Sequence, residues 1–258
     1  MKRISMALLI LAAGAGSALA AGSPFAGTWK LNVAKSKFTG DTFTYSKTAT
    51  GFHFSDGGPR AYNFAVDGKD YPTVADRTTA WTSAGKNAWD VVTKAHGTVL
   101  TKTHRTLSAD GKTLTASYTE YRQDGTIVHE SDVYTRVSGG PGLAGKWRDV
   151  KVQAASDTMT VATPSPGRFE IDFPSDKVTL AGKTDGSATP ATGPTAPPGA
   201  VSHYTAAAPN RWEFDGALNG KTFFKGVMTV SADGKTLTRT TWVPGKETEK
   251  TVEVYDRA

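Results

Sequence analysis

The chain contains one eight-residue string twice: SADGKTLT stands at 108–115 and again, letter for letter, at 231–238. Each half also has a Gly-x-Trp near its start and a Tyr-x-Arg at its end. Equivalent landmarks in the two halves lie between 116 and 123 positions apart. A repeat of this length indicates duplicated domains rather than a solenoid of short units. We therefore expect two tandem domains, 22–138 and 143–258, separated by a Gly/Pro-rich joint.

The first twenty residues have the pattern of a secretory signal peptide. Lys2 and Arg3 precede a short apolar stretch, and Ala18-Leu19-Ala20 supplies the small residues of a cleavage site. We expect segment 1–20 to be removed after Ala20, which predicts a periplasmic or secreted protein. No transmembrane segment is expected in the mature chain, since the apolar stretch is too short to span a bilayer comfortably.

Composition narrows the classes of partner. The chain has no cysteine, so each half of roughly 115 residues must be held by its core without disulfides. The formal net charge of +6 falls to +4 once Lys2 and Arg3 are removed, and the remaining charges are scattered. Scattered positive charge favours solubility, and we expect no nucleic-acid partner. We assign no oligomeric state.

Short runs rich in Thr, Val and aromatic residues alternate with turn signals along the whole mature chain. The signals in the first half begin at Asp67, Ala84, His96, Ala109 and Gln123. This pattern predicts an all-β antiparallel meander. The tract 183–200, rich in Pro, Gly and Thr, is expected to be a mobile surface loop rather than a strand.

The repeated landmarks resemble those of the calycins, the superfamily of lipocalins and fatty-acid-binding proteins. FAGTWKLN at Phe25 and LAGKWRDV at Leu143 are similar to the opening strand, and VYTR and VYDR at the ends of the halves are similar to the last strand. A longer pattern, GTWKLNVAKSKF together with DGKDYP and SADGKTLT, also resembles exported, lipocalin-like bacterial proteins of unassigned function. The resemblance implies two tandem up-and-down barrels, each with a tryptophan at its closed base under an arginine of the last strand.

On this basis we expect barrel closure by Trp29 with Arg136 and by Trp147 with Arg257. An alternative is that each half is an open sheet or a sandwich and that the two copies close one shared structure. One departure from the family concerns the ligand. Fatty-acid-binding proteins have a carboxylate-binding arginine two positions before the last-strand tyrosine, where this chain has Asp132 and Glu253. An acid there would repel a fatty-acid anion, so the resemblance argues against that ligand.

Two arginines are expected on the apolar side of the hairpins that contain the repeated string. With a turn at 110–111, Arg105 faces Ala116, and in the second copy Met228 faces Arg239. A buried arginine without a partner is costly. Under one interpretation Arg105 pairs with an acid, Glu120, or both arginines lie near a wet barrel mouth. The sharper hypothesis is that each arginine binds an anionic group of a ligand.

The residues expected to form the ligand walls are aromatic or aliphatic, and the two tryptophans among them are also good candidates for plain core packing. They are Trp89, Val91 and Tyr118 in the first copy, and Trp212, Phe214, Phe224 and Met228 in the second.

No motif in the chain indicates catalysis or a bound cofactor. There is no Gly-x-Ser-x-Gly and no His-Glu-x-x-His, and the five histidines have no metal-ligand spacing. We assign no catalytic residue, no cofactor and no metal. The first hypothesis is an exported, non-enzymatic protein that binds a small, partly apolar molecule. The alternatives are a structural or interaction protein of the cell envelope with filled barrels and, third, a barrel enzyme that acts on a hydrophobic substrate.

Overall fold

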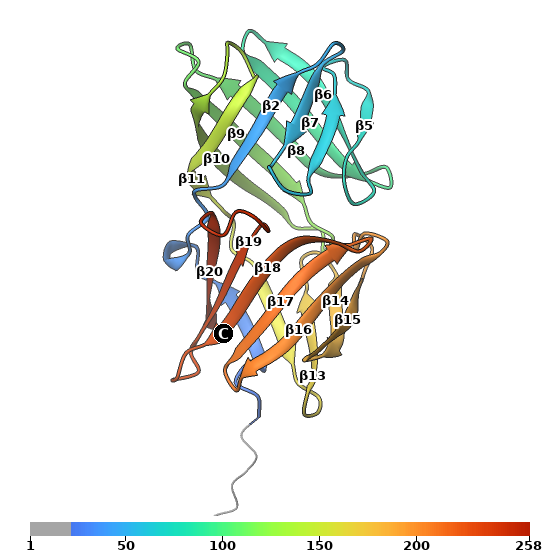
Figure 1. Cartoon of the computed structure of the whole chain (residues 1–258), viewed down its shortest axis with the longest axis vertical. Coiled ribbons are helices and arrows are strands. Elements are labelled where there is room, and N and C mark those ends of the chain that lie inside the picture. The colour runs from blue at the N-terminus through green and yellow to red at the C-terminus, as the bar shows by residue number, and fades with distance from the viewer. Residues whose placement is uncertain (1–21) are drawn as a thin grey trace, which may run out of the picture.

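A computed structural model describes residues 22–258, and the predicted signal peptide lies outside this range. Almost every element in the described part is a strand: there are twenty, with one short 3-10 helix, η1 (Val33–Lys35). They form two ten-stranded antiparallel barrels stacked end to end (Figure 1). The all-β, two-barrel prediction is confirmed. Within residues 22–258, no helix has the length and apolar character needed to cross a bilayer.

The first barrel is a meander that is closed except for one seam. Its strands are β2 (Thr42–Lys47), β3 (Phe52–Ser55), β4 (Ala61–Phe64), β5 (Asp70–Pro72), β6 (Arg77–Gly85), β7 (Ala88–Ala95), β8 (Thr98–Leu107), β9 (Thr113–Tyr121), β10 (Ile127–Ser138) and β11 (Gly145–Gln153). β4 and β5 form the two edges of this sheet and do not pair with each other.

The second barrel is fully closed. Its strands are β1 (Gly27–Leu31), β12 (Thr158–Ala162), β13 (Arg168–Phe173), β14 (Val178–Lys183), β15 (Asp185–Thr192), β16 (Ala200–Ala208), β17 (Arg211–Leu218), β18 (Lys221–Val230), β19 (Thr236–Trp242) and β20 (Lys250–Arg257).

The two halves of the sequence exchange their opening strands. β1 pairs with β12 and β20 in the second barrel, and β11 pairs with β10 and β2 in the first. The predicted ranges 22–138 and 143–258 therefore assign one strand of each barrel to the wrong partner. The reason is the link 139–144, which is short enough to fold back as a hairpin, so β11 pairs with the strand just before it.

The predicted pairing of base residues is wrong for the same reason. Cζ of Arg136 lies 4.1 Å from the ring centre of Trp147, and Cζ of Arg257 lies 4.2 Å from that of Trp29. The guanidinium-over-indole contact is present twice, with the tryptophans exchanged. Each barrel thus closes with a tryptophan from the other half of the sequence, which combines the predicted contact with part of the shared-closure alternative.

The base contact is anchored by backbone carbonyls. Nε1 of Trp147 donates to the carbonyl oxygen of Leu143 at 3.0 Å, and both tryptophans are fully buried. The Arg136 guanidinium donates at 2.6–2.8 Å to carbonyl oxygens of Gly111, Gly140, Gly142 and Ala144. Charged donors to carbonyls make strong hydrogen bonds, so one side chain ties the turns around the barrel base together.

The two repeated motifs supply a hydrogen-bond acceptor and the space for the arginine at each barrel base. Gly111 and Gly234, at the turn of each SADGKTLT, accept a hydrogen bond at 2.6 Å from Nε of Arg136 and Arg257, respectively. In the Gly-x-Trp motif, a Cβ added at Gly145 would lie 2.5 Å from Nη1 of Arg136. The φ of Gly145 is +150°, a value that other residues rarely adopt. The repeated glycines are therefore required by the base contact itself.

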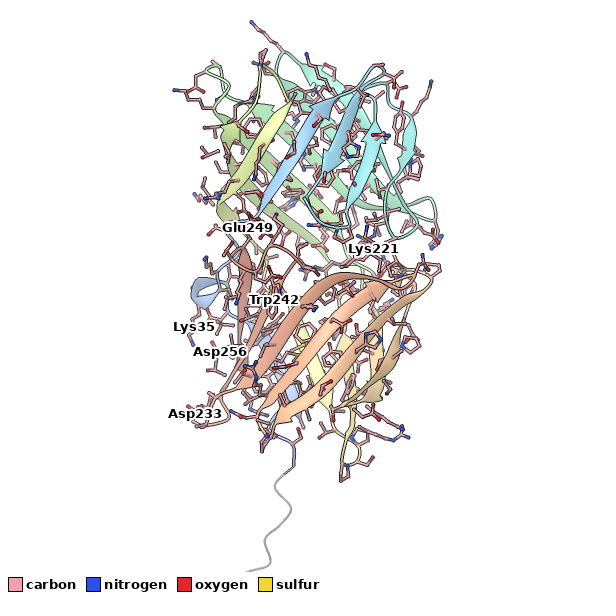
Figure 2. The ribbon with its side chains drawn as sticks, viewed as in Figure 1. Lys35, Lys221, Asp233, Trp242, Glu249 and Asp256 are labelled. Atoms are coloured by element: carbon pink, nitrogen blue, oxygen red, sulfur yellow. The ribbon has the colours of Figure 1, made fainter. Side chains whose placement is uncertain are left out.

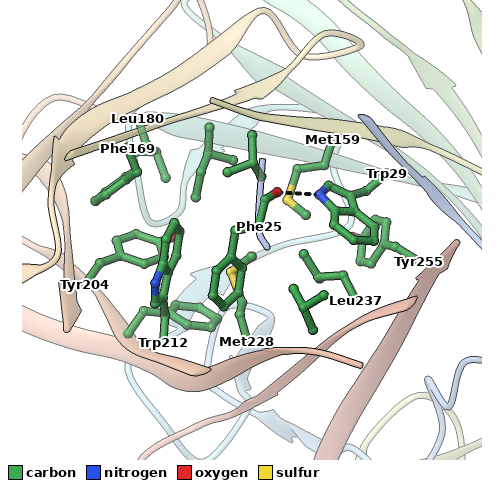
Figure 3. Packing of buried hydrophobic residues seen from close by; sticks show 14 of the residues in the cluster. Phe25, Trp29, Met159, Phe169, Leu180, Tyr204, Trp212, Met228, Leu237 and Tyr255 are labelled. Carbon is green, nitrogen blue, oxygen red and sulfur yellow. Dashed lines mark hydrogen bonds between the residues drawn. The ribbon is translucent and has the colours of Figure 1, made fainter. Parts of the chain in front are cut away.

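Aromatic side chains fill the base half of the second barrel. Phe25 stacks on Trp212 with ring centres 3.9 Å apart, and Met159 and Met228 pack beside them (Figure 3). Nε1 of Trp29 donates to the Phe25 carbonyl at 2.8 Å, which places this aromatic plug above the base. Ligand space in this barrel is therefore restricted to the half farther from the base.

The prediction of a loop over 183–200 is wrong for most of that tract. β15 spans Asp185–Thr192, and apart from the bend at Thr184 only 193–199 is a loop. Thr189 of β15 is almost fully buried, and a Cβ added at Gly182 would collide with it. The threonines suit a pleated strand, and Gly182 makes room for the close approach, so local Pro and Gly content did not decide the structure.

We expect Arg136→Met to lower the free energy of unfolding by about 2–4 kcal/mol, because several charge-assisted hydrogen bonds and the indole contact are lost. Arg257→Met should cost less, since Arg257 is exposed. Arg148→Met, on an exposed residue of β11, is the control and should change stability by less than about 0.5 kcal/mol in urea unfolding.

The strand exchange also predicts which fragment can fold. Fragment 32–157 carries every strand of the first barrel and should unfold cooperatively on heating. Fragment 22–138 follows the sequence repeat but lacks β11, so the edges of β2 and β10 are unpaired and Trp147 is missing. A cooperative melt of 22–138 alone would contradict the exchanged topology.

Candidate functional site

The two barrels meet at the ends opposite their bases, here called the mouths. Asp233, in a base turn of the second barrel, lies far from the junction, whereas Glu249 and Trp242 lie at it (Figure 2). Across the junction, Lys246 Nζ donates to the carbonyl oxygens of Thr42 and Asp56, both at 2.9 Å. Glu249 accepts from the backbone N–H of Thr42 at 3.1 Å. These bonds hold the barrels mouth to mouth.

A cavity of about 370 Å³ lies in the mouth of the second barrel. Residues of the second barrel form its apolar wall, and the first barrel covers it. The wall includes Phe173, Val178, Leu180, Ala191, Tyr204, Ala217, Leu218, Phe223 and Phe224, and the cover consists of Arg60, Val74, Ala75 and Arg77. Burial raises the pKa of Tyr204 to about 12, so its phenol is neutral at physiological pH. The site is incomplete in either barrel alone.

Apart from Arg60, which precedes β4, the cover belongs to a tight hairpin between β5 and β6. Thr73 N donates to the Arg77 carbonyl at 2.8 Å, and the two central residues, Ala75 and Asp76, have φ values of 63° and 52°. Both angles lie in the left-handed region, which costs a non-glycine residue about 1–2 kcal/mol. A strained turn persists only where its surroundings determine it, and here the surroundings are the mouth of the other barrel.

Two of the predicted ligand residues of the second barrel line this cavity, and the others lie below it. Phe224 and Arg239 belong to the lining. Phe214 is buried, with its ring centre 5.3 Å from Cζ of Arg239. Trp212 and Met228 belong to the plug near the base. The predicted strand register is confirmed, because Met228 lies opposite Arg239.

In the first barrel, Arg105 lies among aromatic rings. Its Cζ is 5.6 Å from the ring centre of Trp81 and 5.9 Å from that of Tyr118. Nε and Nη1 of Arg105 are buried and have no hydrogen-bond partner among residues 22–258. Burial raises the pKa of the neighbouring phenols Tyr45 and Tyr134, so they remain neutral and do not compensate the charge. Of the two predicted anion-binding arginines, Arg105 is the one whose donors are free.

The remaining predicted residues of the first barrel lie next to Arg105 or within the hydrophobic core. Trp89 lies directly opposite Arg105 on β7, and Val91 is buried in the core. The predicted acid Glu120 forms an ion pair with Arg122 at 3.5 Å and none with Arg105. The interpretation that Arg105 pairs with Glu120 is therefore wrong.

Register explains why the two arginines differ. Arg239 on β19 lies directly opposite Glu253 on β20, and their side chains form a short ion pair. In the first barrel, Ala116 separates Arg105 from Asp132 on the same rung. Asp132 instead accepts a hydrogen bond from the Tyr134 hydroxyl at 2.6 Å. Placing the arginine one strand farther from the acid leaves it without a counter-ion.

Across residues 22–258 there is no group of three or more His, Cys, Asp or Glu side chains placed to hold a metal ion. Comparisons with protein-family models, with curated proteins and with solved structures found no match.

Sequence analysis missed the cover of the cavity, which consists of Arg60, Val74, Ala75 and Arg77. No local pattern marks these residues, because they meet the second barrel only after the strands exchange and the mouths come together. One signal for the exchange was present: a Gly/Pro-rich link between two alternating runs is also a hairpin signal, and it stands at 139–144.

The two arginines are expected to respond oppositely to substitution in the ligand-free protein. Arg105→Met removes an uncompensated buried charge and should raise the free energy of unfolding by about 1–3 kcal/mol. Arg239→Met leaves Glu253 without its partner and should lower it by about 2–4 kcal/mol. The double variant Arg239→Met/Glu253→Met should recover most of that loss. Urea unfolding measures all three, and a loss of stability in Arg105→Met would contradict the assignment.

Proposed function

We propose that the chain is an exported, non-enzymatic protein that binds a small, partly apolar molecule in the mouth of the second barrel. The observation that carries the proposal is the apolar cavity of about 370 Å³. Small-molecule sites occupy about 300–1,000 Å³, are lined mostly by apolar side chains and lie preferentially at domain interfaces and barrel mouths. The signal-peptide pattern supports export, and the resemblance to calycins supports binding inside a barrel.

The layout of the core favours binding over the alternative of filled barrels. Phe25, Trp29 and Trp212 fill the base half of the second barrel, which supplies the stability. The mouth half has apolar walls but retains open volume, although well-packed cores contain few voids larger than a water molecule. The strained cover at Ala75 and Asp76 adds to this argument, because such turns cluster at ligand clamps.

A neutral fluorescent probe, N-phenyl-1-naphthylamine, tests the proposal. We expect saturable binding with a rise in fluorescence, because the dye is an apolar molecule that fits a cavity of this size. Ala191→Trp fills the cavity from β15 and should abolish the signal. Ala207→Trp, at an exposed position on the neighbouring strand, is the matched control and should bind as the parent chain does.

Equal binding by the parent chain and Ala191→Trp would place the dye elsewhere and remove the basis of the proposal. Failure of the parent chain to bind the dye would also remove the basis of the proposal.

A further inference from the structure

Three guanidinium groups border the cavity, and two of them are already neutralised. Arg239 forms an ion pair with Glu253. Arg60 forms one with Asp56, with 2.7 Å between Nε and Oδ2. A guanidinium whose charge and donors are engaged by a carboxylate has little left to offer a ligand. These two arginines therefore leave no unpaired guanidinium for an anionic ligand.

The third, Arg77, is different. Its Nε is buried and has no hydrogen-bond partner within the described range 22–258. Asp176 and Glu120 line the adjoining crevice on the other side of Arg77, but neither forms an ion pair with it. Arg77 is the first residue of β6 and belongs to the first barrel, yet it lines the cavity of the second. The strained turn at Ala75 and Asp76 immediately precedes it and holds it there.

Arg77 is half-buried, and a guanidinium whose Nε is buried without a partner is costly, so an anion that accepts from it offsets the cost. The planar group also presents parallel N–H donors that match the two oxygens of a carboxylate or sulfonate. The aromatic and aliphatic wall opposite, which includes Tyr204 and Phe224, suits an apolar body. The cavity thus combines an apolar chamber with one guanidinium that forms no ion pair among the described residues.

From this charge distribution we infer that the cavity takes an apolar organic monoanion, whose acidic head group binds Arg77 while its body lies among the aromatic residues of the second barrel. This inference rests on the proposed function and specifies its ligand class. Both barrels then contribute to ligand binding: the first supplies the arginine that binds the acidic group, and the second supplies the wall that contacts the apolar part.

A matched pair of dyes separates the two contributions. The probe 8-anilino-1-naphthalenesulfonate has the same aromatic skeleton as N-phenyl-1-naphthylamine and adds one sulfonate. Both are titrated into the full chain carrying Arg105→Met, so that the free arginine of the first barrel cannot bind the sulfonate. In this background, Arg77→Met should weaken sulfonate binding at least tenfold and change binding of the neutral dye less than twofold.

Arg211→Met provides the control, because Arg211 is an exposed arginine paired with Glu213 on the outer surface. It should change neither affinity. If Arg77→Met folds poorly by its melting profile, Arg77→Gln replaces it, since glutamine keeps a hydrogen-bond donor and removes the charge. The same selective loss is expected.

Four outcomes overturn the inference, and they are distinguishable. Unchanged sulfonate binding in Arg77→Met shows that the arginine does not read the charge. An equal loss for both dyes shows that Arg77 supports the cavity wall rather than the head group. Failure of both dyes to bind the parent chain overturns the proposed function as well, whereas normal binding of the neutral dye alone leaves that function standing.

Discussion

The fold depends on one interaction that occurs twice: an arginine of a last strand lies across the indole of an opening strand and donates to the carbonyls of the surrounding turns. Several sequence features serve this contact. The glycine before each tryptophan leaves space for the guanidinium, and the repeated turn presents the carbonyl oxygen that accepts from Nε. The arginine stabilises the barrel base because charge-assisted hydrogen bonds to carbonyls are strong and the indole face attracts a cation.

Strand exchange sets the relation between the barrels and, with it, the candidate site. Because β1 and β11 each belong to the barrel of the other half, the chain crosses the junction both after β1 and after β11. The crossings bring the mouths together, and Lys246 and Glu249 fasten them. The β5–β6 turn can then cover a cavity in the neighbouring barrel. A pair of barrels joined only by a flexible linker would offer no such composite wall.

The sequence predicted local and repeated features well. The all-β architecture followed from the spacing of turns, and the strand register around Arg105 and Arg239 followed from the repeated hairpin. The long-range choices were different. Whether Trp29 meets Arg136 or Arg257 depends on which of two equivalent strands is nearer in space, and duplicated halves carry the same pattern for both. The loop expected at 183–200 was wrong because burial of Thr189 outweighed local Pro and Gly content. Arg77 was missed because its partners belong to the other barrel.

The position of β1 has a consequence for the order of folding. This strand is made before any other strand of the described chain, but its neighbours β12 and β20 lie far along the sequence, and β20 is the last strand within residues 22–258. The first barrel can complete its sheet once β11 has been made, whereas the second must wait until β20 has been made. Until then the edge of β1 that pairs with β20 has no partner, and Trp29 has no arginine above it. Contacts between the two ends of a chain slow folding, because a large loop must close before they form. Folding of the second barrel is therefore a late event, in which β1 pairs with β20 after nearly all other strands have been made.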